Sequence, residues 1–437
     1  MEIRLMFHWI KKLTLLLLCT AFFVGCSNDA SDNPAIPPEE PAPEPAPEEE
    51  STNQAPDSFD LISIENETVD ATRIPTFQWQ VATDPDNDPV TYDLFIGTQD
   101  PPTVLYKENL STTSIEIESP LALLKDYFWK VTAKDDKNAT TESAVFNFTT
   151  RNLDIPENPT VTEGPFSERR QPASTIFINK MWLIGGFDTN SNFLNDIWQS
   201  ENGTDWELVT DNPAFNGRWD HTLTAFDGKL WLIGGYDGDD YLEDVWYSED
   251  GTEWQEADVS SSFPERGRHT TLVYDNKLWV IGGYNGGSLS DVWYSENGTE
   301  WLQATGEAAF GKRSMHASVV FDEKLWVIAG SDGTRRNDSW YSENGADWVL
   351  ANNSSGFSPR IRHTALVYDN KIWVMGGANP GTIGDIWYSE NGIDWSAVQD
   401  EHPFPERSDH TSLAFDAKIW VLCGYDGTSN NEVWSFD

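Results

Sequence analysis

A repeat of about 47 residues constrains this chain more than any other feature of its sequence. A glycine pair, or an Ala-Gly or Cys-Gly variant of it, begins at residues 185, 234, 282, 329, 376 and 423. Successive copies therefore lie 49, 48, 47, 47 and 47 residues apart. Each pair ends an apolar run, and regularly spaced tryptophans follow it. Four β segments per copy at this period are typical of β-propeller blades, so we expect an all-β ring of six blades.

The glycine pairs and the spaced tryptophans resemble kelch repeats, and the resemblance covers residues 158–437. It implies a six-bladed kelch-type (galactose oxidase-like) β-propeller. In one copy the expected strands are 269–274, 277–281, 291–295 and 301–304. The sixth copy stops within its third strand, at Phe436-Asp437. We therefore expect residues 159–162 to close the ring by pairing with the last blade, which removes an open sheet edge.

The charge of the chain excludes one class of partner. Its 437 residues carry 28 basic against 72 acidic side chains, for a formal net charge of −44. A chain this acidic does not attract nucleic acid through its net field. Three cysteines are too few for a disulfide framework. The 21 tryptophans argue against disorder over most of the chain.

The first residues have the pattern of an export signal. Basic residues precede an apolar run, 13–25, which is shorter than the roughly 20 residues that span a bilayer. The run ends in Phe-Val-Gly-Cys, which resembles a bacterial lipobox. The resemblance implies a signal peptide over 1–25, a lipid anchor on Cys26 and, with Ser27 next, an outer-membrane or cell-surface destination. Ordinary signal cleavage beside an incidental cysteine is the alternative.

Two segments lie between the leader and the repeats. Residues 26–56 include PPEEPAPEPAPEEE, the composition of a stiff, solvated linker. Residues 57–151 give short alternating segments between turn signals, which favours a small β-sandwich. This segment resembles a fibronectin type III domain. Trp79 stands where that family keeps its core tryptophan, and Leu121 and Tyr127 match its tyrosine corner.

One loop of the predicted sandwich is a candidate metal site. Asp84, Asp86 and Asp88 alternate along it, and carboxylate oxygens are ligands that Ca²⁺ prefers. No distant glutamate completes an EF-hand, so an Asx-rich loop without an ion is the alternative. Apart from this calcium candidate we expect no metal and no cofactor.

Arginines are predicted to collect on one face of the propeller. In each copy the loop before the first strand and the loop between the second and third strands share a face, and eleven arginines fall in these loops. They are Arg169, Arg170, Arg218, Arg266, Arg268, Arg313, Arg335, Arg336, Arg360, Arg362 and Arg407. Guanidinium groups suit an anionic ligand because they pair with carboxylate or sulfate.

Some of these residues recur once per copy, which favours a structural role. One arginine per copy is matched by an acid before the first tryptophan, so we expect Arg–acid pairs between blades. Five histidines also share one repeat position: His221, His269, His316, His363 and His410. Six-fold geometry spreads them too far apart for one metal ion, so we expect them to make structural hydrogen bonds.

Residues that break the repeat are the stronger candidates for ligand binding. They are Arg268, Arg335, Arg336, Arg362, Trp219, Tyr236, Tyr284 and Tyr425. Together they predict a membrane-anchored surface protein that binds a glycan or a protein, with an anionic ligand favoured. The alternative is a carbohydrate-active enzyme on the same face, such as an oxidase, a sialidase-like enzyme or an acidic-sugar mutarotase. No catalytic residue can be assigned from the sequence.

Overall fold

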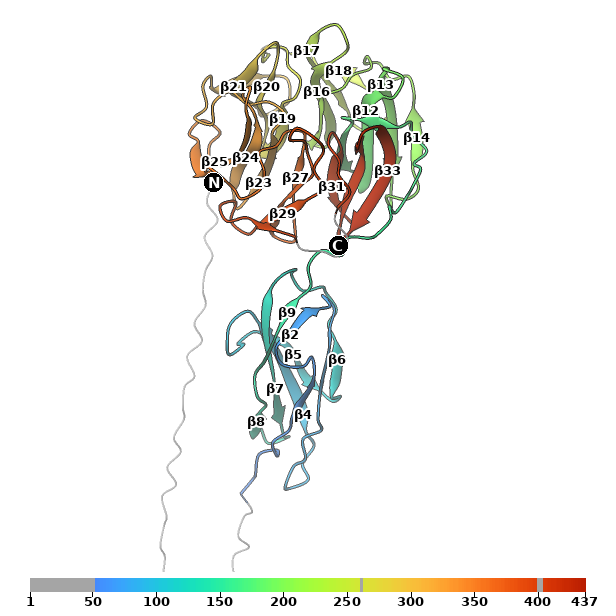
Figure 1. Ribbon diagram of the computed structural model, residues 1–437. Helices are drawn as coiled ribbons and strands as arrows, with labels where there is room; N and C mark the ends of the chain where they lie inside the picture. Colours follow the sequence, from blue (N-terminus) through green and yellow to red (C-terminus); the bar gives the residue numbers. More distant parts are fainter. Residues whose placement is uncertain (1–51, 260–261, 399–403) are drawn as a thin grey trace, which may run out of the picture. The chain divides into compact units, whose positions relative to one another are not determined.

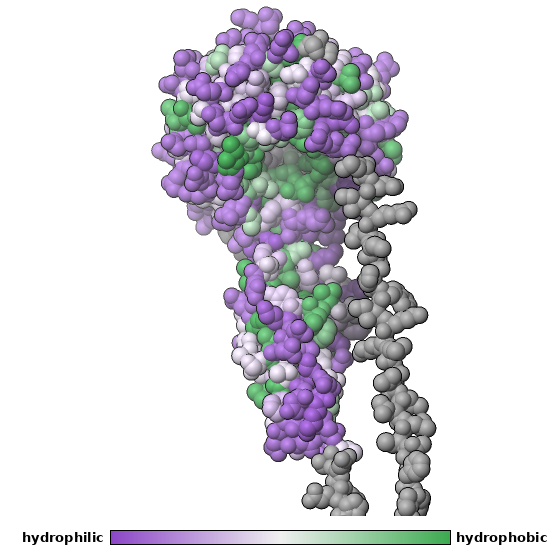
Figure 2. Space-filling model, turned by 180° about the vertical axis from the view of Figure 1, so that it is seen from behind, coloured by the Kyte–Doolittle hydropathy of each residue, from purple (hydrophilic) through white to green (hydrophobic). Residues whose placement is uncertain are grey.

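The computed structural model describes residues 52–259, 262–398 and 404–437. Within these ranges every regular element is a β-strand (Figure 1). No helix there is long and apolar enough to cross a membrane. The leader, Cys26 and nearly all of the Pro/Glu-rich segment lie outside the described residues. The surface seen in Figure 2 is largely hydrophilic, as the excess of acidic residues requires.

The first nine strands form two sheets around one core. The smaller sheet has the order β1-β3-β6, and in the larger one β2-β9-β7-β4-β5 pair in that order with β8 beside β7. Their bounds are β1 Leu61–Ser63, β2 Thr68–Ala71, β3 Thr76–Trp79, β4 Thr91–Gly97, β5 Leu105–Leu110, β6 Ser114–Glu116, β7 Asp126–Lys134, β8 Thr140–Glu142 and β9 Phe146–Thr150. Trp79 is buried between the sheets, and the Tyr127 hydroxyl accepts a hydrogen bond from the Ala122 N–H at 3.1 Å. The fibronectin type III assignment stays a prediction.

The remaining strands form the propeller blades. Blade 1 holds β10 Arg169–Arg170, β11 Ala173–Phe177, β12 Lys180–Asp188, β13 Phe193–Ser200 and β14 Glu207–Thr210. Blade 2 holds β15 Thr222–Phe226, β16 Lys229–Tyr236, β17 Tyr241–Ser248 and β18 Gln255–Glu256. Blade 3 holds β19 Thr270–Tyr274, β20 Lys277–Tyr284, β21 Ser288–Ser295 and β22 Trp301–Thr305. Blade 4 holds β23 Ala317–Phe321, β24 Lys324–Ser331, β25 Arg335–Ser342 and β26 Val349–Asn352. Blade 5 holds β27 Thr364–Tyr368, β28 Lys371–Met375, β29 Ile386–Ser389 and β30 Ser396–Ala397. Blade 6 holds β31 Thr411–Phe415, β32 Lys418–Tyr425 and β33 Ser429–Phe436.

The blades close into a ring around a central axis. Their first strands, β11, β15, β19, β23, β27 and β31, contact one another in a closed circle, so they line the axis. At the seam, Val161 pairs antiparallel with Val433, with N–H···O distances of 3.0 and 2.9 Å in the two directions. A further bond of 3.0 Å joins the Gly164 N–H to the Asn431 carbonyl. Residues 161–164 thus cover the outer edge of β33.

Turns between the third and fourth strands lock each blade onto its neighbour. Gly298 has a φ of 80°, and a Cβ there would overlap the indole of Trp231 in the preceding blade. Blades 1, 2, 4 and 5 repeat this contact. Trp373 of blade 5 is covered differently: it is fully buried in a cluster that includes Leu123, Leu153 and Ile155. Residues that precede the first blade therefore cover Trp373, the position that a turn of the next blade covers elsewhere in the ring.

Candidate functional site

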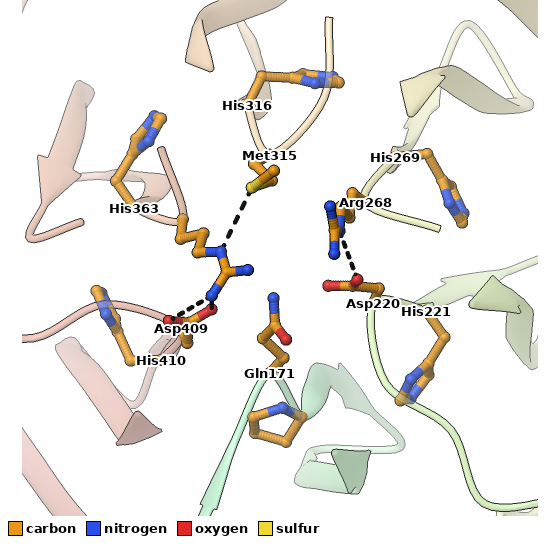
Figure 3. A pocket seen from close by; sticks show the side chains of 12 residues that line it. Gln171, Asp220, His221, Arg268, His269, Met315, His316, His363, Asp409 and His410 are labelled. Carbon is orange, nitrogen blue, oxygen red and sulfur yellow. Dashed lines mark hydrogen bonds and ion pairs between the residues drawn. The ribbon is translucent and has the colours of Figure 1, made fainter. Parts of the chain in front are cut away.

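Six residues, one from each blade, narrow the central channel at one face. This throat ring consists of Gln171, Asp220, Arg268, Met315, Arg362 and Asp409 (Figure 3). Each lies two residues after the arginine that recurs in every copy. Backbone N–H···O bonds of 2.7 to 3.1 Å link five of the six neighbouring pairs around the ring. The channel mouth is therefore held by main-chain bonds between blades.

The backbone of the throat ring is left-handed at every position. The φ angles of the six residues lie between 53° and 59°. For a residue with a Cβ this conformation costs roughly 1 kcal/mol or more, and glycine or asparagine adopts it most easily. None of the six is glycine or asparagine. Five of them carry charged or amide side chains, and the sixth is Met315.

Ion pairs across blades neutralise two of the predicted site arginines. Arg268 Nε lies 2.8 Å from Asp220 Oδ2, and Arg362 Nη1 lies 3.0 Å from Asp409 Oδ1. The sequence predicts a face rich in arginine here, but aspartates at the same repeat position of the neighbouring blades pair with both Arg268 and Arg362. Burial raises the pKa of Asp220, and the charge of Arg268 opposes the shift.

The five repeat histidines form a layer directly behind the throat ring. Three of them bond to a threonine of the preceding blade, as His316 Nε2 does with Thr270 Oγ1 at 3.0 Å. Alanine replaces that threonine before His221 and His363, whose ring nitrogens make no hydrogen bond of good geometry. Burial lowers the pKa of His221, His316 and His410 to about 3, and the nearby repeat arginines add to this effect. This layer is therefore uncharged at neutral pH.

The once-per-copy arginines belong to the scaffold. Arg169, Arg218, Arg266, Arg313, Arg360 and Arg407 are buried and lie 2.6 to 2.8 Å from an acid. Each acid lies on the third strand of the blade that follows the arginine's loop, or directly before that strand, as Asp244 of blade 2 does for Arg218. The Arg218 main chain bonds to Leu194 and Gly186 of blade 1, while its guanidinium pairs with Asp244 of blade 2. The predicted Arg–acid pairs are therefore present and link neighbouring blades.

A side cavity opens beside the throat ring between blades 4, 5, 6 and 1. Its volume is about 570 Å³, and Arg170, Arg335, Arg362, Tyr425 and Asp426 contribute to its lining. Every other arginine in the described ranges has an acid within 4.0 Å, whereas Arg170 and Arg335 have none there. The Nε atoms of both are buried without a hydrogen-bond partner. Two unneutralised guanidinium groups thus line one cavity.

The predicted pair Arg335 and Arg336 does not act together. Successive residues of β25 point to opposite faces of the strand, so only Arg335 lines the side cavity. Arg336 is exposed and lies 2.5 Å from Asp332, whose pKa it lowers. Arg336 is therefore a surface ion pair outside the cavity.

The predicted aromatic residues fall into two groups. Tyr425 lines the side cavity, where the Arg170 guanidinium lies 5.4 Å from its ring centre and 5.6 Å from that of Trp219. Tyr236 and Tyr284 lie farther round the mouth and both contact Tyr241, which sequence reasoning missed. Tyr236 and Tyr241 border a second cavity of about 690 Å³ that is rich in carboxylates. The eight predicted residues therefore do not form one site.

The calcium candidate has a compact geometry. One oxygen each from Asp84, Asp86 and Asp88 lies within 4.8 Å of the others. Asp84 Oδ1 also accepts bonds from the N–H groups of Asp86 and Asp88, and Lys137 Nζ lies 2.8 Å from Asp88 Oδ2. These contacts stabilise the loop as an Asx-type turn, and calcium binding stays a prediction.

Comparison with known proteins confirms the kelch-type propeller fold. Residues 122–330 match the family model "KLHDC2/KLHL20/DRC7 Kelch-repeats domain", and residues 321–435 match "DUF6242 beta propeller domain". Among solved structures, "Structure of YjhT" aligns with a TM-score of 0.50 at 15% identity, covering 64% of this chain and 96% of that one. At this identity the likeness shows the fold alone. No curated protein matches the chain.

Proposed function

We propose that this protein is a surface binding protein that captures an anionic ligand, part of a glycan or of a protein, in the side cavity. One observation carries the proposal: the two described arginines without an acid partner, Arg170 and Arg335, line the same cavity. In a chain with 72 acids and 28 basic residues, arginines without an acid partner are exceptional. Carboxylate or sulfate groups would pair with both guanidinium groups. Tyr425 adds an aromatic face for a sugar ring or an apolar side chain.

The test is an array of sulfated, carboxylated and neutral glycans together with acidic peptides, probed with the chain from residue 27 onward. We expect acidic probes to bind, and Arg335→Gln or Arg170→Gln to weaken binding at least about tenfold, as for loss of a charge-assisted hydrogen bond. Affinity should fall as salt rises, because the screening length is only about 10 Å at 0.1 M.

Arg336→Gln is the matched control for Arg335→Gln. It removes an adjacent guanidinium that lies outside the cavity, so binding and thermal stability should stay unchanged. Binding of neutral probes only, or equal sensitivity to Arg335→Gln and Arg336→Gln, would contradict the proposal.

An enzyme acting on a bound carbohydrate is the second candidate, because Asp426 and the Arg362–Asp409 pair line the same cavity. Array ligands should therefore be incubated with the protein and followed by NMR. In a binding protein, Asp426→Asn reduces affinity by degrees and no product forms. Turnover that this single substitution abolishes would favour the enzyme.

The membrane anchor is proposed from the lipobox resemblance. We expect Cys26→Ser to move the protein from the membrane fraction to the soluble exported fraction, because the thiol is the atom that lipidation modifies. Fractionation followed by immunoblotting measures the shift, with Cys423→Ser as the control, since that thiol is buried in the propeller. Retention of Cys26→Ser in the membrane fraction would mean that the leader is not a lipoprotein signal.

A further inference from the structure

Opposite charges occupy opposite arcs of the throat ring. In blade order, Arg268 of blade 3 and Arg362 of blade 5 flank Met315 of blade 4. Asp220 and Asp409 flank Gln171 (Figure 3). One side of the channel mouth is therefore cationic and the other anionic, while the ring as a whole has no net charge. A ligand with a single charge would gain from one arc and be repelled by the other.

Several polar atoms of the ring keep unused bonding capacity. Arg268 donates to Asp220 through Nε only, so both of its Nη groups have no hydrogen-bond partner among the described residues. The same holds for Nη2 of Arg362. On the anionic side, Gln171 Oε1 is buried without a partner, and Asp220 accepts an ion pair on Oδ2 alone. Donors therefore face the channel from one arc and acceptors from the other.

The space and the backbone both fit a small ligand. The cavity at the throat has a volume of about 140 Å³, enough for a group of several heavy atoms. The left-handed backbone would be satisfied by glycine at all six positions, yet the chain keeps charged or amide side chains at five of them. Residues held in such conformations cluster at ligand sites. These side chains are consequently placed to contact something in the channel.

We propose that the throat ring binds a compact zwitterion, a group in which an ammonium and a carboxylate are one or two carbons apart, as in a free α-amino acid. The carboxylate would accept from the Nη groups of Arg268 and Arg362. The ammonium would donate to the Asp220 carboxylate and to Gln171 Oε1. This inference is independent of anion capture in the side cavity, which depends on Arg170 and Arg335.

Titration with three small probes tests the proposal on the unmodified protein. Glycine carries both charges, acetate only the negative one and methylammonium only the positive one. In calorimetry or ligand-observed NMR at pH 7 and low salt, we expect glycine to bind at least about tenfold tighter than either other probe. 6-Aminohexanoate, whose charges are farther apart, should bind no better than acetate.

Variants then locate the zwitterion. The double substitution Asp220→Asn with Arg268→Gln removes one charge of each sign without leaving an unpaired ion, and it should weaken glycine binding at least about tenfold. Arg335→Gln should leave glycine binding unchanged. Loss of glycine binding in Arg335→Gln would place the zwitterion in the side cavity and overturn the assignment. Failure of glycine to bind, or equal binding of acetate, would overturn the proposal without reference to any variant.

Discussion

Lowering the pH from 7.5 to 4.5 is expected to destabilise the propeller steeply, because the histidine layer is buried and uncharged. In the folded protein the pKa of His221, His316 and His410 is about 3, and that of His269 and His363 is well below 6.5. In the unfolded chain each pKa is near 6.5, so the unfolded state binds more protons below that pH. Stability is therefore fully present above about pH 6.5 and is lost as the pH falls toward 3.

Each buried histidine contributes a loss of about 1.4 kcal/mol per pH unit below its unfolded pKa. All five groups act in the same direction, so the loss is steep compared with the roughly 5–15 kcal/mol stability of a typical domain. Asp220 acts in the opposite direction, since burial raises its pKa and its folded form binds a proton more readily. The proton bound by one aspartate does not offset the loss of stability caused by five histidines as the pH falls.

Urea unfolding curves at pH 7.5, 6.5, 5.5 and 4.5 measure this effect. The slope of unfolding free energy against pH gives the difference in bound protons, and His363→Leu should lower that slope by about one proton below pH 6. His363 suits this test because its ring nitrogens make no hydrogen bond of good geometry. An unfolding free energy that stays constant between pH 7 and 5 would show that the histidines already titrate in the folded protein.

The fold could be predicted from the sequence because every blade repeats the same pattern of strands, glycines and tryptophans. The expected strands 277–281 and 291–295 are the cores of β20 and β21, which extend to Lys277–Tyr284 and Ser288–Ser295. The apolar pattern ends at Ile281, yet pairing continues beyond a bulge at Gly282. In the first two sheets, the residues of β5 are mostly exposed and lack an apolar alternation, so their side chains do not predict a strand there. Strand pairing that depends on main-chain hydrogen bonds cannot be predicted from the pattern of apolar side chains.

The candidate site was predictable only in part. Sequence spacing found Arg335 and Arg362, and strand alternation, had it been applied to β25, would have separated Arg335 from Arg336. Asp220 and Asp409 were missed, although they occupy the same repeat position as Arg268 and Arg362 and carry the opposite charge. Arg170 was placed on the correct face but was not among the eight ligand-binding candidates. Which arginines remain unpaired depends on distances between blades, and a single sequence does not contain these.

Arg313→Ala is expected to lower the free energy of unfolding by about 3–5 kcal/mol, the range for breaking a buried ion pair. The Arg313 side chain is 3% exposed and its Nη1 lies 2.7 Å from Asp338 Oδ1. The same nitrogen also donates to the Ala329 carbonyl at 2.8 Å. Removing the guanidinium thus leaves a largely buried carboxylate and a main-chain carbonyl without their partner. Denaturant unfolding at pH 7.5 measures the loss.

Two further variants separate this explanation from a general sensitivity of the arginine face. Arg336→Ala should change stability by no more than about 0.5 kcal/mol, because its ion pair with Asp332 is solvent-exposed. Adding Asp338→Asn to Arg313→Ala should recover part of the loss, since the stranded charge disappears while the amide oxygen still accepts from Trp340 Nε1, which lies 2.9 Å away. Two outcomes would contradict this explanation: equal losses of stability in Arg313→Ala and Arg336→Ala, or no recovery in the double variant. Either would show that burial does not distinguish the structural arginines from the exposed ones.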